Sequence, residues 1–294
     1  MGTGFASSYT SKWDYHSMNN RVLLLVDCSN HVYKSAHVHA ALTCEGRFTG
    51  GLYGVLHAVA KAILMTKATD LVICYDTKPY LRSLTYPDYK SIRVGTKDEE
   101  LVARANETMG YLKQLNTLLG LPTWAVKGFE CDDLIAHAAH KYRNRFKNIV
   151  AASHDSDLYQ LFRYKNFLVW KGKNGLYDRN DFENEYHIQP DKFVTLLSLT
   201  GTHNEVAGIN KVGPVIATRA INSPSFMRQL RTTYADLIDR NYGLIQLPHP
   251  EFPSNEILPI KTTKFRDRDL INFCNGFDIS TSQAMLDAFA QISK

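Results

Sequence analysis

The sequence lacks the features that direct a chain into a membrane, a secretory pathway or an oxidising compartment. None of its 294 residues lies in an apolar run of the roughly eighteen needed to cross a bilayer. The first residues show neither the charged nor the apolar segment of a signal peptide, and Ala6 stands where a myristoylation signal has Ser or Thr. The five cysteines are scattered, with no Cys-x-x-Cys pair, which favours free thiols. We therefore expect a cytoplasmic protein in a reducing compartment, with no membrane partner.

A strong excess of one charge is also missing, since 34 basic residues face 29 acidic ones and the net charge is +5. With 44% hydrophobic and 21% charged residues, the composition is that of a globular protein with a sizeable core. The length allows one large domain or two ordinary ones. Composition alone is compatible with an ordinary, slightly basic enzyme.

An unusual concentration of acid lies in the middle of the chain, at Glu130, Asp132 and Asp133. An apolar-periodic run from Leu134 to Ala139 follows directly, so these acids fall in the first turn of a predicted helix. One explanation is helix capping, because acids in a first turn favour the helix dipole. The other is a bound cation, because three neighbouring carboxylates repel one another and raise one another's pKa.

Acidic residues also end the predicted strands. The apolar runs 21–27 and 70–76 each finish in an aspartate, Asp27 or Asp76, and residues 51–67 between them have helical spacing. This pattern predicts a βαβ unit with both carboxylates at the carboxyl ends of parallel strands, where ligands bind in open sheets. A further strand at 148–152 is followed by a carboxylate pair, Asp155 and Asp157.

Residues 77–97 are basic, with Asp88 as their one acid. Cations and tyrosines alternate there: Lys78, Tyr80, Arg82, Tyr86, Tyr89, Lys90, Arg93 and Lys97. Such interleaving suits a nucleic-acid backbone and its exposed bases. A solvated basic loop is the alternative.

The alternation of strand and helix stops near Pro190, and residues 201–213 form a region punctuated by glycine. Glycine-rich turns between short helices let backbone amides approach a phosphate. We therefore predict a flexible tail at 1–20, an α/β domain at 21–185 and a helical domain at 186–294.

Eight acids form the predicted metal constellation: Asp27, Asp76, Glu130, Asp132, Asp133, Asp155, Asp157 and Glu205. A set with only oxygen ligands selects hard cations such as Mg²⁺ or Mn²⁺. Removing eight negative charges from a net charge of +5 leaves +13 on the remaining residues. A basic shell around an acidic centre suits a polyanionic substrate.

At this point the chain resembles the 5′-nucleases, the flap endonucleases and 5′→3′ exonucleases, including phage enzymes that remove RNA primers. The resemblance covers roughly residues 21–222 and rests on the order and spacing of five motifs. They are Val26-Asp27, Tyr75-Asp76, Tyr89-Lys90-Ser-Ile-Arg93, Phe129-Glu130-Cys-Asp132-Asp133 and Ser153-His-Asp155-Ser-Asp157. The region from Gly201 to Gly213 falls where the family has its helix–three-turn–helix DNA-binding motif.

The resemblance implies a PIN-like α/β fold with a mostly parallel sheet and a helical arch near residues 85–115. It implies that residues 21–185 form a catalytic nuclease domain and residues 186–294 a helical DNA-binding domain. It implies two metal ions, the first held by residues matching Asp27, Asp76, Glu130 and Asp132. Asp133, Asp155, Asp157 and Glu205 match ligands of the second. Lys90 and Arg93 match catalytic cations at the base of the arch.

Five residues are implied as substrate-binding: Arg82 and Tyr89 near the arch, and Gly208, Lys211 and Gly213 in the turn region. A K⁺ ion on the turn carbonyls is also implied by the family.

One departure from the family pattern bears on the second metal. The family usually has Gly-Asp-x-x-Asp-Asn where this chain has Gly201-Thr202-His203-Asn204-Glu205-Val206. Thr202 replaces one carboxylate and Glu205 replaces another. We expect weaker binding of the second metal, with a shift in metal preference, in cleavage mode or in activity.

The function expected is metal-dependent hydrolysis at 5′ ends or flaps of branched DNA, and of RNA–DNA primers, by a monomer of phage or bacterial type. Two alternatives stay open. The changes at Thr202 and Glu205 motivate a structure-selective DNA-binding protein with weakened catalysis. A single-strand ribonuclease of the same α/β class would keep the acids, but it would not need the glycine-rich region.

Overall fold

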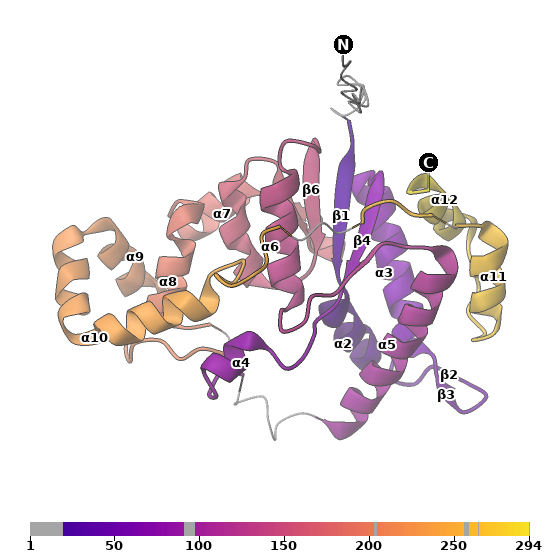
Figure 1. Ribbon diagram of the computed structural model, residues 1–294, viewed down its shortest axis with the longest axis horizontal. Coiled ribbons are helices and arrows are strands. Elements are labelled where there is room, and N and C mark those ends of the chain that lie inside the picture. The colour runs from indigo at the N-terminus through magenta and orange to yellow at the C-terminus, as the bar shows by residue number, and fades with distance from the viewer. Residues whose placement is uncertain (1–19, 91–97, 203–204, 256–258, 264, 294) are drawn as a thin grey trace, which may run out of the picture.

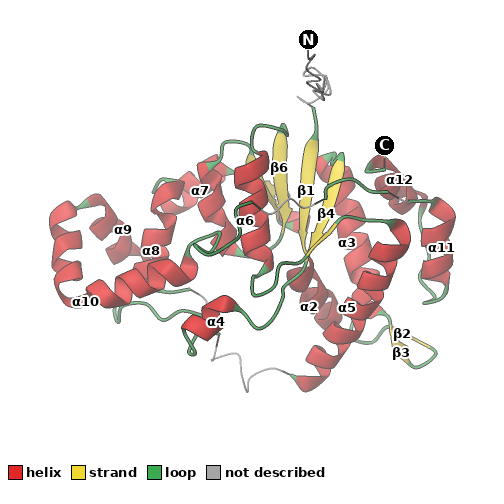
Figure 2. Cartoon of the chain, viewed as in Figure 1, coloured by secondary structure: helices red, strands yellow, loops and turns green. Residues whose placement is uncertain are grey.

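The computed structural model describes residues 20–90, 98–202, 205–255, 259–263 and 265–293. Its centre is a six-stranded sheet in the order β5-β4-β1-β6-β7-β8. The strands are β1 (Val22–Asp27), β4 (Asp70–Cys74), β5 (Thr123–Trp124), β6 (Asn148–Ala152), β7 (Phe167–Trp170) and β8 (Leu176–Tyr177). All neighbouring pairs are parallel except β7 and β8. The predicted class, a mostly parallel sheet flanked by helices, is confirmed (Figure 2).

Strand β1 lies at the centre and separates two hydrophobic cores. Leu23 and Leu25 belong to one core, whereas Leu24 and Val26 belong to the other, and all four are completely buried. Alternate residues of a strand point to opposite faces, so an uninterrupted apolar run is what a strand covered on both sides requires.

Helices cover both faces (Figure 1). One face carries α2 (Cys28–Val38), α3 (Gly50–Thr66) and α5 (Glu99–Leu119). The other carries α6 (Cys131–Tyr142), the 3₁₀ segment η2 (Ser156–Arg163) and α7 (Arg179–Tyr186). A short hairpin of β2 (Thr43–Cys44) and β3 (Arg47–Phe48) links α2 to α3.

The helices after residue 186 divide between two places (Figure 1). Following the short η4 (Pro190–Lys192), α8 (Phe193–Thr200), α9 (Pro214–Asn222) and α10 (Pro224–Ile245) pack on one another at one end of the molecule. In contrast, α11 (Asp267–Asn275) and α12 (Gln283–Gln291) return to the core shared by α3 and α5. The expected boundary near residue 185 stays a prediction, but the helices beyond it do not form one group.

The segment expected to form an arch, near residues 85–115, begins at the end of the short helix α4 (Leu81–Thr85) and includes most of α5. The short η3 (Gly172–Asn174) lies between β7 and β8. Residues 91–97, with Arg93 among them, lie outside the described residues, as does part of the tail expected at 1–20. Within the described ranges, no helix is both long enough and apolar enough to span a membrane.

Candidate active site at the carboxyl rim of the sheet

The strand register brings three of the predicted acidic motifs together. Asp27 ends β1 opposite Cys74, two residues before Asp76, and Val26 pairs with Ala152 at the end of β6. We call this region the carboxyl rim: the carboxyl ends of β1, β4 and β6, the residues directly after them, and the side chains of Lys90, Glu130, Asp132 and Glu205 that lie beside them. Parallel strands are responsible for this gathering, since their carboxyl ends meet on one side of the sheet.

Asp27 and the pair after β6 are joined through Ser153. The Ser153 hydroxyl donates to Asp27 Oδ2 at 2.8 Å and accepts from the Asp155 amide at 3.1 Å. Asp155 in turn accepts from the amide of Asp157 at 2.9 Å, as the N-cap of η2. Ser153 belongs to one of the sequence motifs, but no role was assigned to it there, although its position directly after a buried strand was the available signal.

The acid-rich stretch joins the rim through Asp76. Asp76 Oδ1 accepts from the amide of Cys131, the first residue of α6, at 2.8 Å, and Oδ2 accepts from the Tyr80 hydroxyl at 3.3 Å. The acids at the start of α6 therefore both cap this helix and contribute to the candidate site. Glu130 is the N-cap of α6 and forms a capping box with Asp133.

The buried acids of the rim raise one another's pKa. Burial, followed by the charge of Asp76, raises the pKa of Asp27 to about 7. Burial raises the pKa of Asp132 well above its usual value, and the charges of Asp155 and Asp27 add to this effect. Burial also raises the pKa of Asp157, with contributions from Asp155 and Glu205. Such shifts show a concentration of negative charge that the surrounding protein compensates only in part.

This environment fits divalent cations. Asp132 Oδ1 is buried and makes no hydrogen bond to the described residues, and it lines a small polar cavity with Glu130, Asp157, Thr202 and Glu205. The donors are oxygens throughout, as Mg²⁺ and Mn²⁺ prefer. Among the residues that the structure describes, no three acidic, histidine or cysteine side chains are already arranged around one ion position.

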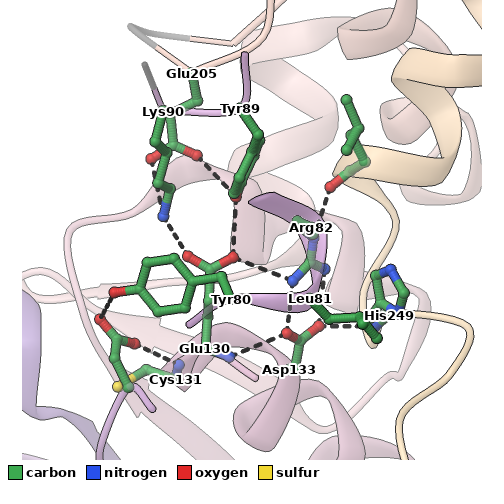
Figure 3. Close-up of polar contacts among 12 residues, drawn as sticks. Tyr80, Leu81, Arg82, Tyr89, Lys90, Glu130, Cys131, Asp133, Glu205 and His249 are labelled. Atoms are coloured by element: carbon green, nitrogen blue, oxygen red, sulfur yellow. Dashed lines mark hydrogen bonds and ion pairs between the residues drawn. The ribbon is translucent and has the colours of Figure 1, made fainter. Parts of the chain in front are cut away.

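Lys90 is the cation that the chain itself places at this rim. Its ammonium makes a short ion pair with Glu130 Oε1 and lies 3.3 Å from Glu205 Oε1 (Figure 3). The rings of Tyr80 and Tyr89 flank it, with centroids 5.3 and 5.2 Å from Nζ. Lys90 therefore lies beside two of the predicted metal ligands, and its catalytic role stays a prediction.

Tyr89 does not have the exposed ring expected of a base-stacking residue. The residue is 8% exposed, and its hydroxyl donates to Glu130 at 3.0 Å and to Glu205 at 3.3 Å. The interpretation of Tyr89 as a substrate-binding residue is therefore corrected: it holds two carboxylates of the rim.

Arg82 and Asp133 also differ from expectation. Arg82 is 3% exposed and donates to both oxygens of Asp133, at 2.6 and 2.8 Å. Asp133 is completely buried and accepts from the His249 amide at 2.7 Å as well. The assignments of Arg82 to substrate and of Asp133 to the second metal are corrected, because these groups bind each other beneath the surface.

The described part of the glycine-rich region, residues 201–202 and 205–213, packs against the end of α8. A Cβ at Gly201 would lie 2.5 Å from the amide nitrogen of Gly208, and one at Gly208 would lie 2.2 Å from the carbonyl carbon of Thr200. Both positions therefore require glycine. Asn241 of α10 holds this region in place by donating to the carbonyls of Ser198 and Ala207, at 3.0 and 2.8 Å.

The other residues assigned to DNA lie at the end of this region. Lys211 is exposed and has a left-handed backbone with φ of 65°, and Gly213 is the N-cap of α9. Their contact with DNA stays a prediction, as does a K⁺ ion on the turn.

Basic side chains that the sequence did not indicate flank the rim on its β6–β7 side. The Lys34 ammonium donates to His154 Nε2 at 2.7 Å. Burial, followed by the charge of Lys173, lowers the pKa of Lys34. Burial, followed by the charges of Lys34 and Lys171, lowers the pKa of His154. Lys34 lies on α2, about two turns beyond Asp27, so only the fold brings it beside residue 154.

The family described as 5′-3′ exonuclease, N-terminal resolvase-like domain, matches residues 22–187. The chain belongs to this family. Its catalytic class is that of a nuclease, in agreement with the expected activity.

Relatives of the same description support the assignment. The 5′-3′ exonuclease of Aquifex aeolicus is 25% identical over 241 residues, which are 77% of this chain and 82% of that protein. The 5′-3′ exonuclease of Buchnera aphidicola from Acyrthosiphon pisum is 26% identical, with 70% of this chain and 72% of the relative covered. The thermostable DNA polymerase I of Thermus aquaticus is 27% identical over 68% of this chain, and only 23% of the polymerase is matched.

Solved structures show the same fold. The bacteriophage T5 D15 flap endonuclease in a complex with DNA and metal ions aligns with a TM-score of 0.64 and 16% identity, covering 93% of this chain and all of that chain. Flap endonuclease-1 of Methanococcus jannaschii aligns with a TM-score of 0.60 and 15% identity over 94% of each chain.

Proposed function

We propose that this protein hydrolyses phosphodiester bonds at the 5′ ends or flaps of branched DNA during replication or repair, with two divalent cations at the carboxyl rim. The observation that carries the proposal is the gathering of seven carboxylates and Lys90 in a chain of the 5′-3′ exonuclease family. The seven are Asp27, Asp76, Glu130, Asp132, Asp155, Asp157 and Glu205.

Asp27, Asp76, Glu130 and Asp132 would hold the first cation, and Asp155, Asp157 and Glu205 the second. Mg²⁺, or Mn²⁺ as a substitute, would supply activation of the attacking water and stabilisation of the leaving oxygen. Ser153 and the Cys131 amide orient Asp27 and Asp76 through the contacts described above. The Thr202 hydroxyl, buried and without a hydrogen bond to the described residues, replaces a family carboxylate, which leaves the second site with less negative charge.

Lys90 would contact the phosphate that is cleaved. Its ammonium is already at the rim, and a cation positioned there stabilises the charge that develops on the phosphate oxygens. Arg93 would act beside it.

DNA would be held on either side of the rim. Lys34, His154, Lys171 and Lys173 offer a basic flank for the backbone. The described part of the glycine-rich region, with Gly208, Lys211 and Gly213, would approach the duplex through backbone amides, with K⁺ on its carbonyls. An RNA–DNA primer is a further substrate class, and we propose a monomer acting in the cytoplasm.

A cleavage assay tests the proposal. The full chain is incubated with a labelled 5′-flap DNA or a single-stranded RNA, in Mg²⁺, Mn²⁺ or EDTA. We expect metal-dependent cleavage near the flap junction, lost in Asp155→Asn and kept in Asp287→Asn, an exposed carboxylate on α12. Cleavage of the RNA alone would identify a single-strand ribonuclease instead.

A second candidate is a DNA-binding protein with weakened catalysis. Thr202 favours it because this residue replaces a family carboxylate, and Glu205 favours it because its carboxylate already contacts Lys90 and Tyr89. Binding of the flap DNA in EDTA, with no product in either metal, would support this candidate and overturn the nuclease proposal.

A further inference from the structure

Arg82 occupies an unusual position for a residue of a basic segment. It lies on α4, eight positions before Lys90, and its side chain is 4% exposed. Besides Asp133, its guanidinium donates to the carbonyls of Leu244 at 2.8 Å and Gln246 at 3.1 Å. A guanidinium presents five donors in a rigid fork, so it can hold several acceptors at once.

Glu130 also receives this guanidinium. Arg82 donates to Glu130 Oε2 at 3.2 Å, the oxygen that accepts from the Tyr89 hydroxyl at 3.0 Å (Figure 3). The other oxygen, Oε1, faces Lys90. Oε2 of the Glu130 carboxylate is thus held by Arg82 and Tyr89, and Oε1 is paired with Lys90.

The same guanidinium fixes the end of α10 against the rim. Leu244 and Gln246 lie at the end of that helix, and Asp133 accepts the backbone amide of His249 just beyond it. Gln160 of η2 also holds the end of α10. Its side-chain amide donates to the Ile245 carbonyl at 3.1 Å and accepts from the Leu247 amide at 2.8 Å.

We infer that Arg82 is a positioning residue for Glu130, holding this carboxylate in the orientation in which it binds the first cation. The inference rests on the proposed function, because it requires that Glu130 be a metal ligand. Groups behind a metal ligand fix its orientation and thereby set metal affinity. The Arg82 guanidinium is bonded to Glu130, Asp133 and two backbone carbonyls, so its effect on the reaction would pass through Glu130.

The chain contains a matched control for a purely stabilising role. Arg21 donates to both oxygens of Asp70 at the amino ends of β1 and β4, far along the strands from the rim. Removing either arginine breaks an ion pair and should lower the unfolding temperature. Only the loss of Arg82 should also change how the rim binds a cation.

The experiment measures Mn²⁺ affinity of the full chain without DNA, by electron paramagnetic resonance or calorimetry, below the unfolding temperature of every variant. We expect Arg82→Met and Arg82→Lys to weaken Mn²⁺ binding by about 10- to 100-fold. Lysine should fail to rescue because one ammonium cannot span Glu130, Asp133 and two carbonyls. Arg21→Met should bind Mn²⁺ within about twofold of wild type while unfolding at a lower temperature.

The inference would be overturned if folded Arg82→Met bound Mn²⁺ with the affinity of the wild-type protein. If that variant does not fold, Arg82→Lys decides the matter on the same criterion. Failure of the wild-type chain itself to bind Mn²⁺ would instead contradict the proposed function, so the two failures are separable.

Discussion

The two ends of the same parallel strands place acidic side chains in opposite electrostatic settings. At the amino ends, Asp70 accepts from Arg21 Nε at 3.0 Å, from the second guanidinium nitrogen and from the Thr69 hydroxyl at 2.7 Å. At the carboxyl rim, Asp132 Oδ1 is buried with no hydrogen bond to the described residues, and burial with neighbouring acids raises its pKa. At the amino ends the negative charge of the carboxylate is neutralised by a cation, whereas at the carboxyl rim several negative charges lie close together.

The difference separates two uses of buried charge. A fully partnered carboxylate holds strands in register, whereas crowded carboxylates cost stability and are retained where chemistry needs them. Lys90 neutralises only part of the negative charge at the rim. A substitution at Lys90 should therefore change the difference between the two ends of the strands most directly.

Lys90→Ala carries the largest expected effect. Removing the ammonium should lower turnover by about 100- to 1,000-fold, since a positioned donor for developing charge is lost. Affinity for flap DNA should change by only about twofold to threefold, because one phosphate contact contributes little to a large interface. Single-turnover cleavage and DNA titration measure the two quantities.

The exposed Lys211 provides the matched comparison for Lys90. Lys211→Ala should lower DNA affinity and reduce the salt dependence of binding by about one unit of slope. Its cleavage rate at saturating DNA should stay near that of wild type. A reversed pattern between the two variants would place the catalytic cation outside the rim.

His31 tests the rim through pH. Burial, with the charge of His154, lowers the pKa of His31 to about 4, and its Nε2 lies 3.1 Å from the carbonyl of Ala152 at the end of β6. The unfolded chain, with a histidine pKa near 6.5, therefore gains this proton first as the pH falls. The group stabilises the fold fully above about pH 6.5, and about 2 to 3 kcal/mol is lost by pH 4.5.

His31→Gln should consequently show a shallower loss of stability between pH 7 and pH 4.5 in urea unfolding. The difference in unfolding free energy between the variant and the wild-type protein at each pH removes the contribution of the carboxylates, which is the same in both proteins. Parallel curves for the two proteins would contradict the assigned burial.

The smallest effects should have opposite signs at the two ends of the strands. In EDTA, Asp70→Asn should destabilise the protein by about 2 kcal/mol, because it breaks a partly buried ion pair. Asp132→Asn should stabilise it by about 1 kcal/mol, because it removes one of several repelling charges. Thermal unfolding measures the stability change of both variants. A loss of stability in Asp132→Asn would contradict the proposed difference between the two ends of the strands.

Much of this arrangement could be predicted from local sequence. The run from Val22 to Val26, ended by Asp27, specifies a strand buried on both faces with a carboxylate at its end. The same pattern at 70–76 and 148–157 specifies where the other acids lie, since parallel pairing brings such ends together. The helix beginning at Cys131 follows from its apolar spacing and acidic first turn.

The roles of Arg82, Tyr89 and Asp133 could not be read in the same way. Spacing at i, i+2 and i+3 does not say which acid of a first turn faces the rim and which faces the core. Arg82 lies in a basic segment and finds its acceptors at Leu244 and Gln246, more than 160 positions later. Partners so distant are determined by tertiary packing, which no local pattern contains.

The position of β1 at the centre of the sheet has a consequence for folding kinetics. Its neighbours β4 and β6 come from distant parts of the chain, and pairings of this kind form slowly because long loops must close first. The proposed ligands extend from Asp27 to Glu205, so a partly folded chain cannot assemble them. A cation that binds only the finished rim should leave the folding rate unchanged and slow unfolding, which stopped-flow measurements in Mg²⁺ and EDTA would record. Magnesium would then prolong the lifetime of the native state while leaving the time needed to reach it the same.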